Sequence, residues 1–168
     1  MENNSLLDVQ HLSHMFHLKR KMTVKAIDDV SFQIKKGEIY GLVGESGSGK
    51  STVARCIMNI YKPSEGEIFY KGIPICKSKE FRKNRKMLQM TRQMIFQDSA
   101  SSLNPRMKIG DIVAEPLRIY SGKGRPGKKE IEKQLELVGL DRSYMEKYPC
   151  ELSGGQRQRV AIARALST

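Results

Sequence analysis

A glycine-rich stretch in the first third of the chain has the residue types and the spacing that bind phosphate groups. It consists of Gly44, Glu45, Ser46, Gly47, Ser48, Gly49, Lys50, Ser51 and Thr52, and it fits the pattern Gly-x4-Gly-Lys-Ser/Thr. Glycines permit positive φ and a close approach of the backbone, so consecutive N–H groups can point at phosphate oxygens. We expect the Lys50 ammonium to reach the β- and γ-phosphates and the Ser51 hydroxyl to bind Mg²⁺. The stretch therefore predicts a nucleoside triphosphate site.

Two elements must hold this loop in place. The apolar run Ile39-Tyr40-Gly41-Leu42-Val43 before it predicts a fully buried parallel strand. A helix should follow the loop and end before Pro63, and its positive N-terminal end would face the phosphates. The apolar side of that helix would be formed by Thr52, Val53, Ala54, Ile57, Met58 and Ile60.

The remaining pattern divides into a strand-rich first part and a helical second part. Strands are expected around Leu7 and Val9, through the alternating Val30, Phe32 and Ile34, at 67–70, and at Met94-Ile95-Phe96, which would deliver Gln97. Helices are expected at 78–91, at 109–120 with a break before or at Pro116, at 128–138, from an Asp141 cap to Tyr148, and from residue 153 onward.

Composition is that of an ordinary globular domain. The 168 residues are 39% hydrophobic and 29% charged, which suits about one soluble domain. No apolar run approaches the roughly 18 residues that a membrane span needs, and the first residues lack the features of a signal peptide. The three cysteines, Cys56, Cys76 and Cys150, are far apart in the sequence and predict reduced thiols in a cytosol.

The net charge of +12 raises the question of an anionic partner. Seven basic residues between Lys77 and Arg92 are accompanied by a single acid, Glu80. No helix-turn-helix, zinc-finger or RNA-binding signature accompanies them, so no direct nucleic-acid partner is expected, and such runs are commonly solvated helix faces. An alternative use is a surface held near the anionic cytoplasmic leaflet of a membrane.

A second motif, Leu152-Ser153-Gly154-Gly155-Gln156, lies about a hundred residues after the phosphate loop. Together with that loop it makes the chain resemble the ATP-binding proteins of ABC transporters. Met94 to Asp98, followed by Ser102-Leu103-Asn104-Pro105-Arg106-Met107, resembles the Q-loop of the oligopeptide, dipeptide and nickel importer branch, and in particular its F-type subunit. The resemblance covers nearly the whole chain and corresponds to the first two thirds of such a protein.

The resemblance implies a fold and a set of site residues. The fold would be α/β, a P-loop NTPase (RecA-like) core with an antiparallel β flank at 1–97, and a helical signature subdomain with the Q-loop at 98–168, truncated before the Walker B strand. Phe16 would stack on adenine, and Gln97 would contact Mg²⁺ or the attacking water. Ser153, Gly154, Gly155 and Gln156 would bind the γ-phosphate of ATP held by the loop of a second subunit.

The resemblance also implies partners and a location. The expected partners are a second ABC ATPase subunit in a head-to-tail dimer, transmembrane permease subunits and, indirectly, a substrate-binding protein. The expected place is the cytoplasmic face of the cell membrane, and the expected function is the coupling of ATP binding and hydrolysis to import of peptides or nickel.

The acids that such an ATPase needs for hydrolysis are missing from these residues. Phosphoryl transfer requires an aspartate at the end of a second buried strand and a group that orients or deprotonates water. ABC ATPases place an Asp-Glu pair and a histidine after the signature helix, but residues 157–168 contain no acid and no histidine. We therefore expect this chain to bind ATP weakly and not to hydrolyse it. Of the residues that an ABC ATPase uses in catalysis, only Lys50 and Gln97 would be present. We also expect apolar surface of the sheet to be exposed.

Three functional interpretations stay open on the sequence. The first is the energy-coupling ATPase subunit of a peptide importer. The second is a non-catalytic fragment that donates only its signature motif to a partner ATPase. The third is a non-transport ABC protein that acts on nucleic acid.

Overall fold

The computed structural model describes residues 5–18, 22–98, 102–121, 124 and 126–167. The chain forms two compact units, Met1–Leu88 and Gln89–Thr168, and each has a hydrophobic core of its own. Across the part of the chain that the structure describes, no helix combines the length and the apolar character needed to cross a lipid bilayer.

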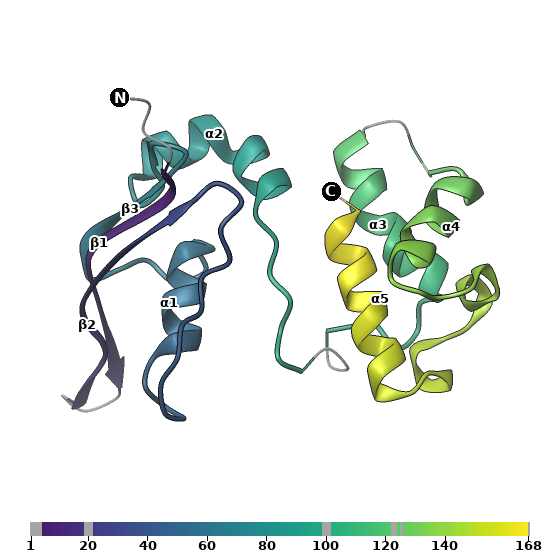
Figure 1. Ribbon diagram of the computed structural model, residues 1–168, viewed down its shortest axis with the longest axis horizontal. Coiled ribbons are helices and arrows are strands. Elements are labelled where there is room, and N and C mark those ends of the chain that lie inside the picture. The colour runs from purple at the N-terminus through teal and green to yellow at the C-terminus, as the bar shows by residue number, and fades with distance from the viewer. Residues whose placement is uncertain (1–4, 19–21, 99–101, 122–123, 125, 168) are drawn as a thin grey trace. The chain divides into compact units, whose positions relative to one another are not determined.

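The first unit is built on an antiparallel sheet, of which Figure 1 labels β1, β2 and β3. The strand order is β2-β1-β3-β4. The strands are β1 (Ser5–Leu18), β2 (Met22–Lys35), β3 (Glu65–Tyr70) and β4 (Ile73–Pro74). The alternation of Val30, Phe32 and Ile34 does lie in a strand, and its polar neighbours are exposed. The predicted antiparallel flank is thus present.

Two helices complete this unit, α1 (Lys50–Ile57) and α2 (Ser78–Thr91). Both contribute to one core with the sheet, because Val53 and Cys56 of α1 and Leu88 of α2 are buried with residues of the strands. The strand residues of this core are Leu7, Val9, Leu12, Ile27, Ile68 and Tyr70. The core fixes α1 against the sheet, and α1 begins where the phosphate loop ends.

The predicted buried strand at 39–43 is not formed. These residues have no regular secondary structure, and the side chains of Ile39 and Val43 are 99% and 92% exposed. A strand needs a neighbour to accept and donate its backbone hydrogen bonds, and no strand of the described residues pairs with this segment. The apolar character was recognised correctly, but the burial that it predicts is absent.

The same explanation applies to the strand predicted at Met94-Ile95-Phe96. This segment also lacks regular structure, and Ile95 and Phe96 are 46% and 42% exposed. The prediction for α1 was partly wrong as well, because the helix ends at Ile57 and Ile60 is 52% exposed. There the backbone turns away, with the Ile60 N–H donating to the Arg55 carbonyl at 2.9 Å.

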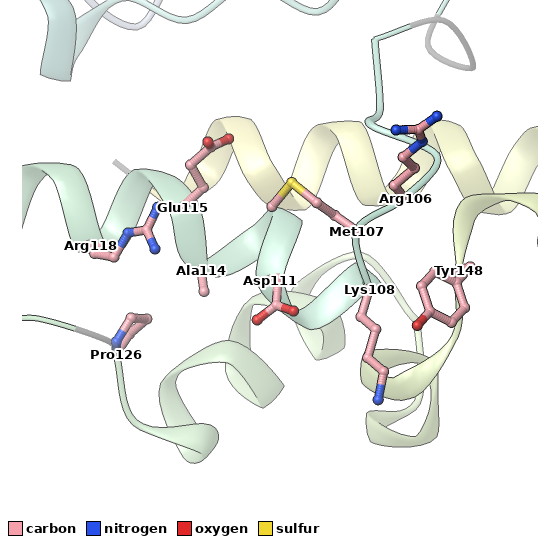
Figure 2. Close-up of a pocket in the computed structure, with 9 residues that line it drawn as sticks. All are labelled: Arg106, Met107, Lys108, Asp111, Ala114, Glu115, Arg118, Pro126 and Tyr148. Atoms are coloured by element: carbon pink, nitrogen blue, oxygen red, sulfur yellow. The ribbon is translucent and has the colours of Figure 1, made fainter.

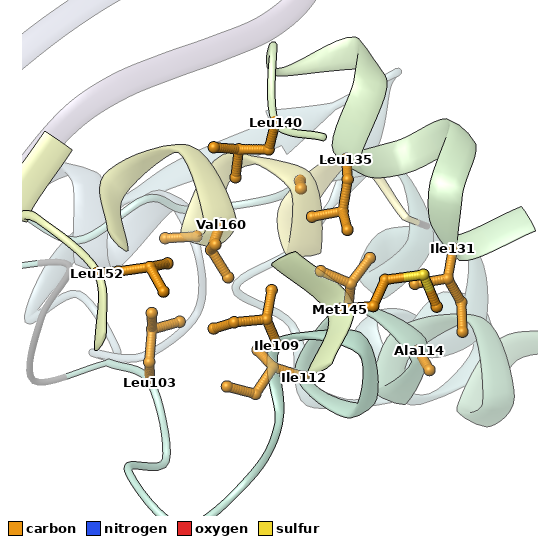
Figure 3. Packing of buried hydrophobic residues seen from close by; sticks show 13 residues of the cluster. Leu103, Ile109, Ile112, Ala114, Ile131, Leu135, Leu140, Met145, Leu152 and Val160 are labelled. Atoms are coloured by element: carbon orange, nitrogen blue, oxygen red, sulfur yellow. The ribbon is translucent and has the colours of Figure 1, made fainter. Parts of the chain in front are cut away.

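The second unit is helical. It contains α3 (Ile109–Ser121), α4 (Lys128–Leu137) and α5 (Gly154–Leu166), with the short 3₁₀ helices η1 (Arg142–Glu146) and η2 (Pro149–Glu151) between α4 and α5. Helix α3 packs against α5, η1 and α4. Figure 3 shows the side chains that meet between them, including Ile109, Ile112, Leu135, Met145 and Val160.

Pro116 does not break α3, contrary to the expectation from the sequence. The helix runs through Pro116 to Ser121. Proline costs an interior helix a hydrogen bond, but Ile109, Ile112 and Val113 are almost completely buried and hold the helix in the core. Tertiary packing therefore outweighs the local preference at this position.

Candidate functional site

The phosphate loop is folded around the side chain of Lys50. The Lys50 ammonium donates to the Gly44 carbonyl at 2.8 Å, the Glu45 carbonyl at 2.5 Å and the Ser48 hydroxyl at 3.1 Å. These three bonds use all the donors that an ammonium group has. The loop thus places its one positive charge at its centre, while residues 44–48 stay exposed around it.

Gly49 joins the loop to α1 and can only be glycine in this geometry. Its φ is +91°, and a Cβ placed on it would lie 2.1 Å from the carbonyl oxygen of Ala26 in β2. Its own carbonyl accepts from the Val53 N–H at 2.9 Å and begins the helix. Gly49 therefore lets the loop pass directly over β2 and enter α1 within one residue.

A cleft of about 410 Å³ lies beside this loop. Its walls come from the loop, the apolar segment before it, β2 and α1, and they comprise Lys25, Ala26, Ile27, Asp28, Val30, Leu42, Val43, Gly44, Ser48, Lys50 and Val53. The lining therefore combines residues of the loop and Lys50 with apolar side chains and with the ion pair of Lys25 and Asp28.

Ser51 is suited to hold a magnesium ion together with a phosphate group. Its side chain lies in the first turn of α1 and is exposed, whereas Thr52 beside it is buried. Mg²⁺ keeps several waters and takes few protein ligands when it binds with phosphates, so one hydroxyl fits this role. No group of three or more His, Cys, Asp or Glu side chains that could bind a metal without phosphate occurs in the described ranges.

Phe16 lies in an aromatic cluster at the end of β1. Its ring contacts the His14 ring and the Tyr61 ring edge to face, with centroids 4.6 and 5.4 Å away. His14 stacks on Tyr61, and the Arg55 guanidinium lies 5.7 Å from the centroid of the Tyr61 ring. Phe16 is half buried by these neighbours, and its proposed contact with adenine stays a prediction.

Gln97 belongs to the second unit and is exposed. The segment that was expected to present it as the end of a strand is irregular, as described above. The structure places the phosphate loop in the first unit and both Gln97 and the signature motif in the second. Contacts of Gln97 with Mg²⁺ or water therefore stay a prediction.

The signature motif is the N-terminus of α5. Ser153 caps the helix: its hydroxyl accepts from the Gln156 N–H at 3.3 Å, and the Gln156 side chain accepts from the Ser153 N–H at 2.9 Å. This reciprocal pair is a capping box. Ser153, Gly154 and Gly155 are exposed, so their backbone N–H groups and the positive helix end face outward, which is the arrangement that binds an anion.

Two residues that the sequence did not single out hold this motif. Tyr144 in η1 accepts from the Gln156 side-chain amide at 2.8 Å. Arg157 donates to the Leu152 carbonyl at 2.5 Å and to the Pro149 carbonyl at 3.5 Å.

The predicted Asp141 cap is present. The Asp141 carboxylate accepts a hydrogen bond from the Ser143 N–H at 2.8 Å, and hydrogen bonds from Ser143 lower the pKa of Asp141.

A second cleft, of about 340 Å³, lies in the helical unit next to the segment that follows Gln97 (Figure 2). It is lined by Arg106, Met107, Lys108, Asp111, Ala114, Glu115, Arg118, Pro126 and Tyr148. Lys108 forms an ion pair with Glu146 at 2.8 Å, and this contact raises the pKa of Lys108. The lining thus combines basic, acidic and apolar side chains.

The comparisons with known proteins all find the same kind of protein. Residues 27–168 match the family described as ABC transporter. The chain is 49% identical over 170 residues to the oligopeptide transport ATP-binding protein OppF of Bacillus subtilis (strain 168), covering 96% of this chain and 53% of that protein. It is 46% identical over 169 residues to OppF of Streptococcus mutans, with 96% and 53% covered. The chain therefore spans about half the length of the curated relatives it matches.

Solved structures of ATP-binding cassettes share the fold. The cassette MJ0796, described as a dimer in a post-hydrolysis state bound to ADP and Pi, is similar with a TM-score of 0.83 and 30% sequence identity. The match covers 96% of this chain and 69% of that one. A second dimeric structure of MJ0796, described as a bacterial ABC transporter cassette, gives a TM-score of 0.78 over the same shares.

Proposed function

This chain belongs to the ABC transporter family, and we propose that it is the ATP-binding part of a subunit that couples ATP binding and hydrolysis to import of peptides. The observation that carries the proposal is the phosphate loop, in which the Lys50 ammonium is held at the centre of an exposed backbone turn. The substrate class is supported by the relatives, which are named as oligopeptide transport ATP-binding proteins.

Lys50 and Ser51 are proposed to meet the triphosphate. A phosphate oxygen is charged and accepts a stronger hydrogen bond than a hydroxyl or a peptide carbonyl, so it can replace one of the three acceptors around the Lys50 ammonium. The exposed Ser51 hydroxyl would hold Mg²⁺, which supplies neutralisation of the phosphate charge when it is bound. Phe16 and Gln97 are proposed to contact the adenine and the metal-bound water site, respectively.

The signature motif is proposed to act on the nucleotide of a second subunit. Ser153, Gly154 and Gly155 are exposed at a capped helix N-terminus. The side-chain amide of Gln156 donates a hydrogen bond to the Tyr144 hydroxyl. The MJ0796 cassettes are described as dimers, one of them bound to ADP and Pi. A head-to-tail pair of ATPase subunits would bring each signature to the partner's phosphate loop.

The membrane partners would be permease subunits at the cytoplasmic face of the cell membrane, with a substrate-binding protein acting through them. We propose the cleft of Figure 2 as the contact site for the permease subunits. Its wall contains Arg106, Met107 and Lys108, which follow the segment that carries Gln97. A segment that touches both nucleotide and permease could couple the two.

Turnover by the 168 residues alone is not expected. Residues 157–168 contain no acid and no histidine, and hydrolysis needs a carboxylate for Mg²⁺ and a group that orients water. We propose that this chain binds ATP and that hydrolysis requires carboxylates from outside these residues. Phosphate release by the purified chain that is abolished by Lys50→Ala would contradict this.

Peptide uptake by cells tests the proposed function as a whole. The experiment measures entry of a radiolabelled oligopeptide into cells in which these residues are part of a subunit that also supplies the carboxylates for hydrolysis. The residues are unchanged, carry Lys50→Ala, or carry Lys36→Ala as a control on an exposed turn. We expect Lys50→Ala to abolish uptake and Lys36→Ala to leave it unchanged. Unaltered uptake with Lys50→Ala would overturn the proposal.

A further inference from the structure

Helix α2 separates its charges from its apolar side chains. Its basic residues are Lys79, Arg82, Lys83, Arg85 and Lys86, and all five are exposed. At about 100° per residue these side chains lie within an arc of about 160°. We call this arc the basic face.

The opposite side of α2 is committed to the core of the first unit. Leu88 is completely buried, and Phe81 and Met87 pack against the same cluster. The orientation of the helix is therefore fixed by its apolar contacts, and the basic face is turned to solvent from Lys79 to Lys86. Lys79 and Lys86 are seven residues apart on this helix, about 10 Å along its axis at 1.5 Å per residue, so the five charges form a compact cluster.

Within the described part of the chain, no acidic side chain neutralises the basic face. None of its five residues forms an ion pair with a carboxylate of the described residues. The one acid of the helix, Glu80, is half buried outside the arc. Helix α4 differs, because its three lysines are interleaved with three glutamates, Glu130, Glu132 and Glu136.

We propose that the basic face of α2 docks on the anionic lipid headgroups of the membrane that carries the transporter. This proposal rests on the proposed function. Basic clusters beside a membrane are attracted to anionic lipids within about a Debye length. The face has no aromatic side chain on which a base could stack, unlike surfaces that bind single-stranded nucleic acid. Such docking would hold the subunit at the membrane independently of its contact with the permease.

Vesicle sedimentation tests this proposal with the full chain. Binding is measured to vesicles of phosphatidylcholine with one quarter phosphatidylglycerol, and to vesicles of phosphatidylcholine alone, at low and at high salt. The variant Arg82→Gln, Lys83→Gln, Lys86→Gln removes three charges from the basic face. The control Lys128→Gln, Lys129→Gln, Lys133→Gln removes three exposed charges from α4, so both variants lower the net charge of +12 equally.

We expect binding that needs phosphatidylglycerol, weakens with salt, and falls at least tenfold in the α2 variant and less than twofold in the α4 variant. Circular dichroism spectra should be the same for all three proteins. Equal losses in both variants, or equal binding to both kinds of vesicle, would overturn the proposal. So would displacement of the chain from vesicles by duplex DNA or by tRNA at equal charge concentration, because it would show that nucleic acid is the preferred partner.

Nucleotide binding is measured on the same samples, so that the two proposals can fail separately. Loss of vesicle binding by the α2 variant with unchanged ATP binding supports the docking face. If unchanged protein binds ATP but no vesicle, the docking face is wrong and the proposed function stands. If it binds vesicles but no ATP, the proposed function fails.

Discussion

Gly49 and Lys50 are adjacent residues with different tasks in the phosphate loop. Gly49 allows a backbone geometry that other residues cannot adopt, because its φ is +91° and the Ala26 carbonyl oxygen occupies the space of a Cβ. Lys50 provides the charge and gathers three oxygen acceptors. The shape of the loop therefore depends on the first residue, and its affinity for phosphate is expected to depend on the second.

Replacement of Gly49 tests the structural task. Gly49→Ala forces a positive φ on alanine and a clash with β2, so we expect the free energy of unfolding to fall by at least about 2 kcal/mol. Gly37→Ala is the matched control, because Gly37 also has positive φ, +79°, but open space around its Cβ position. It should cost only about 1 kcal/mol. Urea denaturation measures both, and equal costs would show that the contact with Ala26 is unimportant.

Most residues of the candidate site could be proposed from the sequence, but their supports could not. Lys50 and Ser51 are set by a local pattern of glycines, and Asp141 by its position before a helix. Tyr144 lies 12 residues before the Gln156 that it contacts, and nothing in the spacing of these two residues predicts a hydrogen bond. Contacts of this kind depend on how η1 folds back on α5, which is a tertiary property.

The elements of the chain were predictable where their stability is local or their partner is close in sequence. Helix α2 spans the predicted range, and β1 and β2 pair as adjacent strands. The strands predicted at 39–43 and at 94–96 are not formed, because strands there would need partners that are not close in the sequence. Their apolar residues indicate burial between other strands, but a strand exists only beside a neighbour, and the described residues form none next to them.

Alanine substitution tests whether the segment at 39–43 contributes to the stability of this chain. Ile39 is 99% exposed, so we expect Ile39→Ala to change the free energy of unfolding by less than about 0.5 kcal/mol. Ile68→Ala in β3 is the contrasting case, because Ile68 is completely buried and its truncation should cost about 2–5 kcal/mol. Thermal unfolding measures both. A large loss for Ile39→Ala would mean that the segment is packed in solution.

The core face of α1 gives a prediction about thiol chemistry. Burial, with a smaller effect of the nearby Cys76, raises the pKa of Cys56 from 9.0 to about 11. Because the thiolate is the reactive form, Cys56 should not react with an aromatic disulfide reagent at pH 8 until the chain unfolds, whereas the exposed Cys150 should react at once. Rapid modification of Cys56 in the folded chain, located by mass spectrometry, would contradict the packing of α1.

The same shift has a consequence for stability at alkaline pH. The unfolded thiol ionises near 9.0 while the folded thiol stays protonated to about 11, so the unfolded state binds fewer protons between these values. The contribution of Cys56 to folding is therefore complete below pH 9 and is lost as the pH rises toward 11. Cys56→Ala should show a smaller loss of stability over this range than the unchanged chain.

At the scale of the whole molecule, charge and chemistry are divided between the two units. The first unit holds the phosphate loop and the basic face of α2, and the second holds the exposed signature at the start of α5. The net charge of +12 could be read from the composition, but the placement of five basic residues on the exposed side of α2 depends on which side of the helix packs into the core. The proposed head-to-tail pair of subunits would use both units, the phosphate loop of one copy and the exposed signature of the other.

Equilibrium binding of ATP tests the central claim most directly. The 168-residue chain is titrated with a fluorescent ATP analogue in the presence of Mg²⁺, beside Lys50→Ala and Lys36→Ala, which remove the same charge from the loop and from an exposed turn. Loss of charge-assisted hydrogen bonds should weaken binding by Lys50→Ala at least about tenfold, and Lys36→Ala should bind as the unchanged chain does. Equal affinities of all three proteins, or no binding by the unchanged chain, would contradict the account.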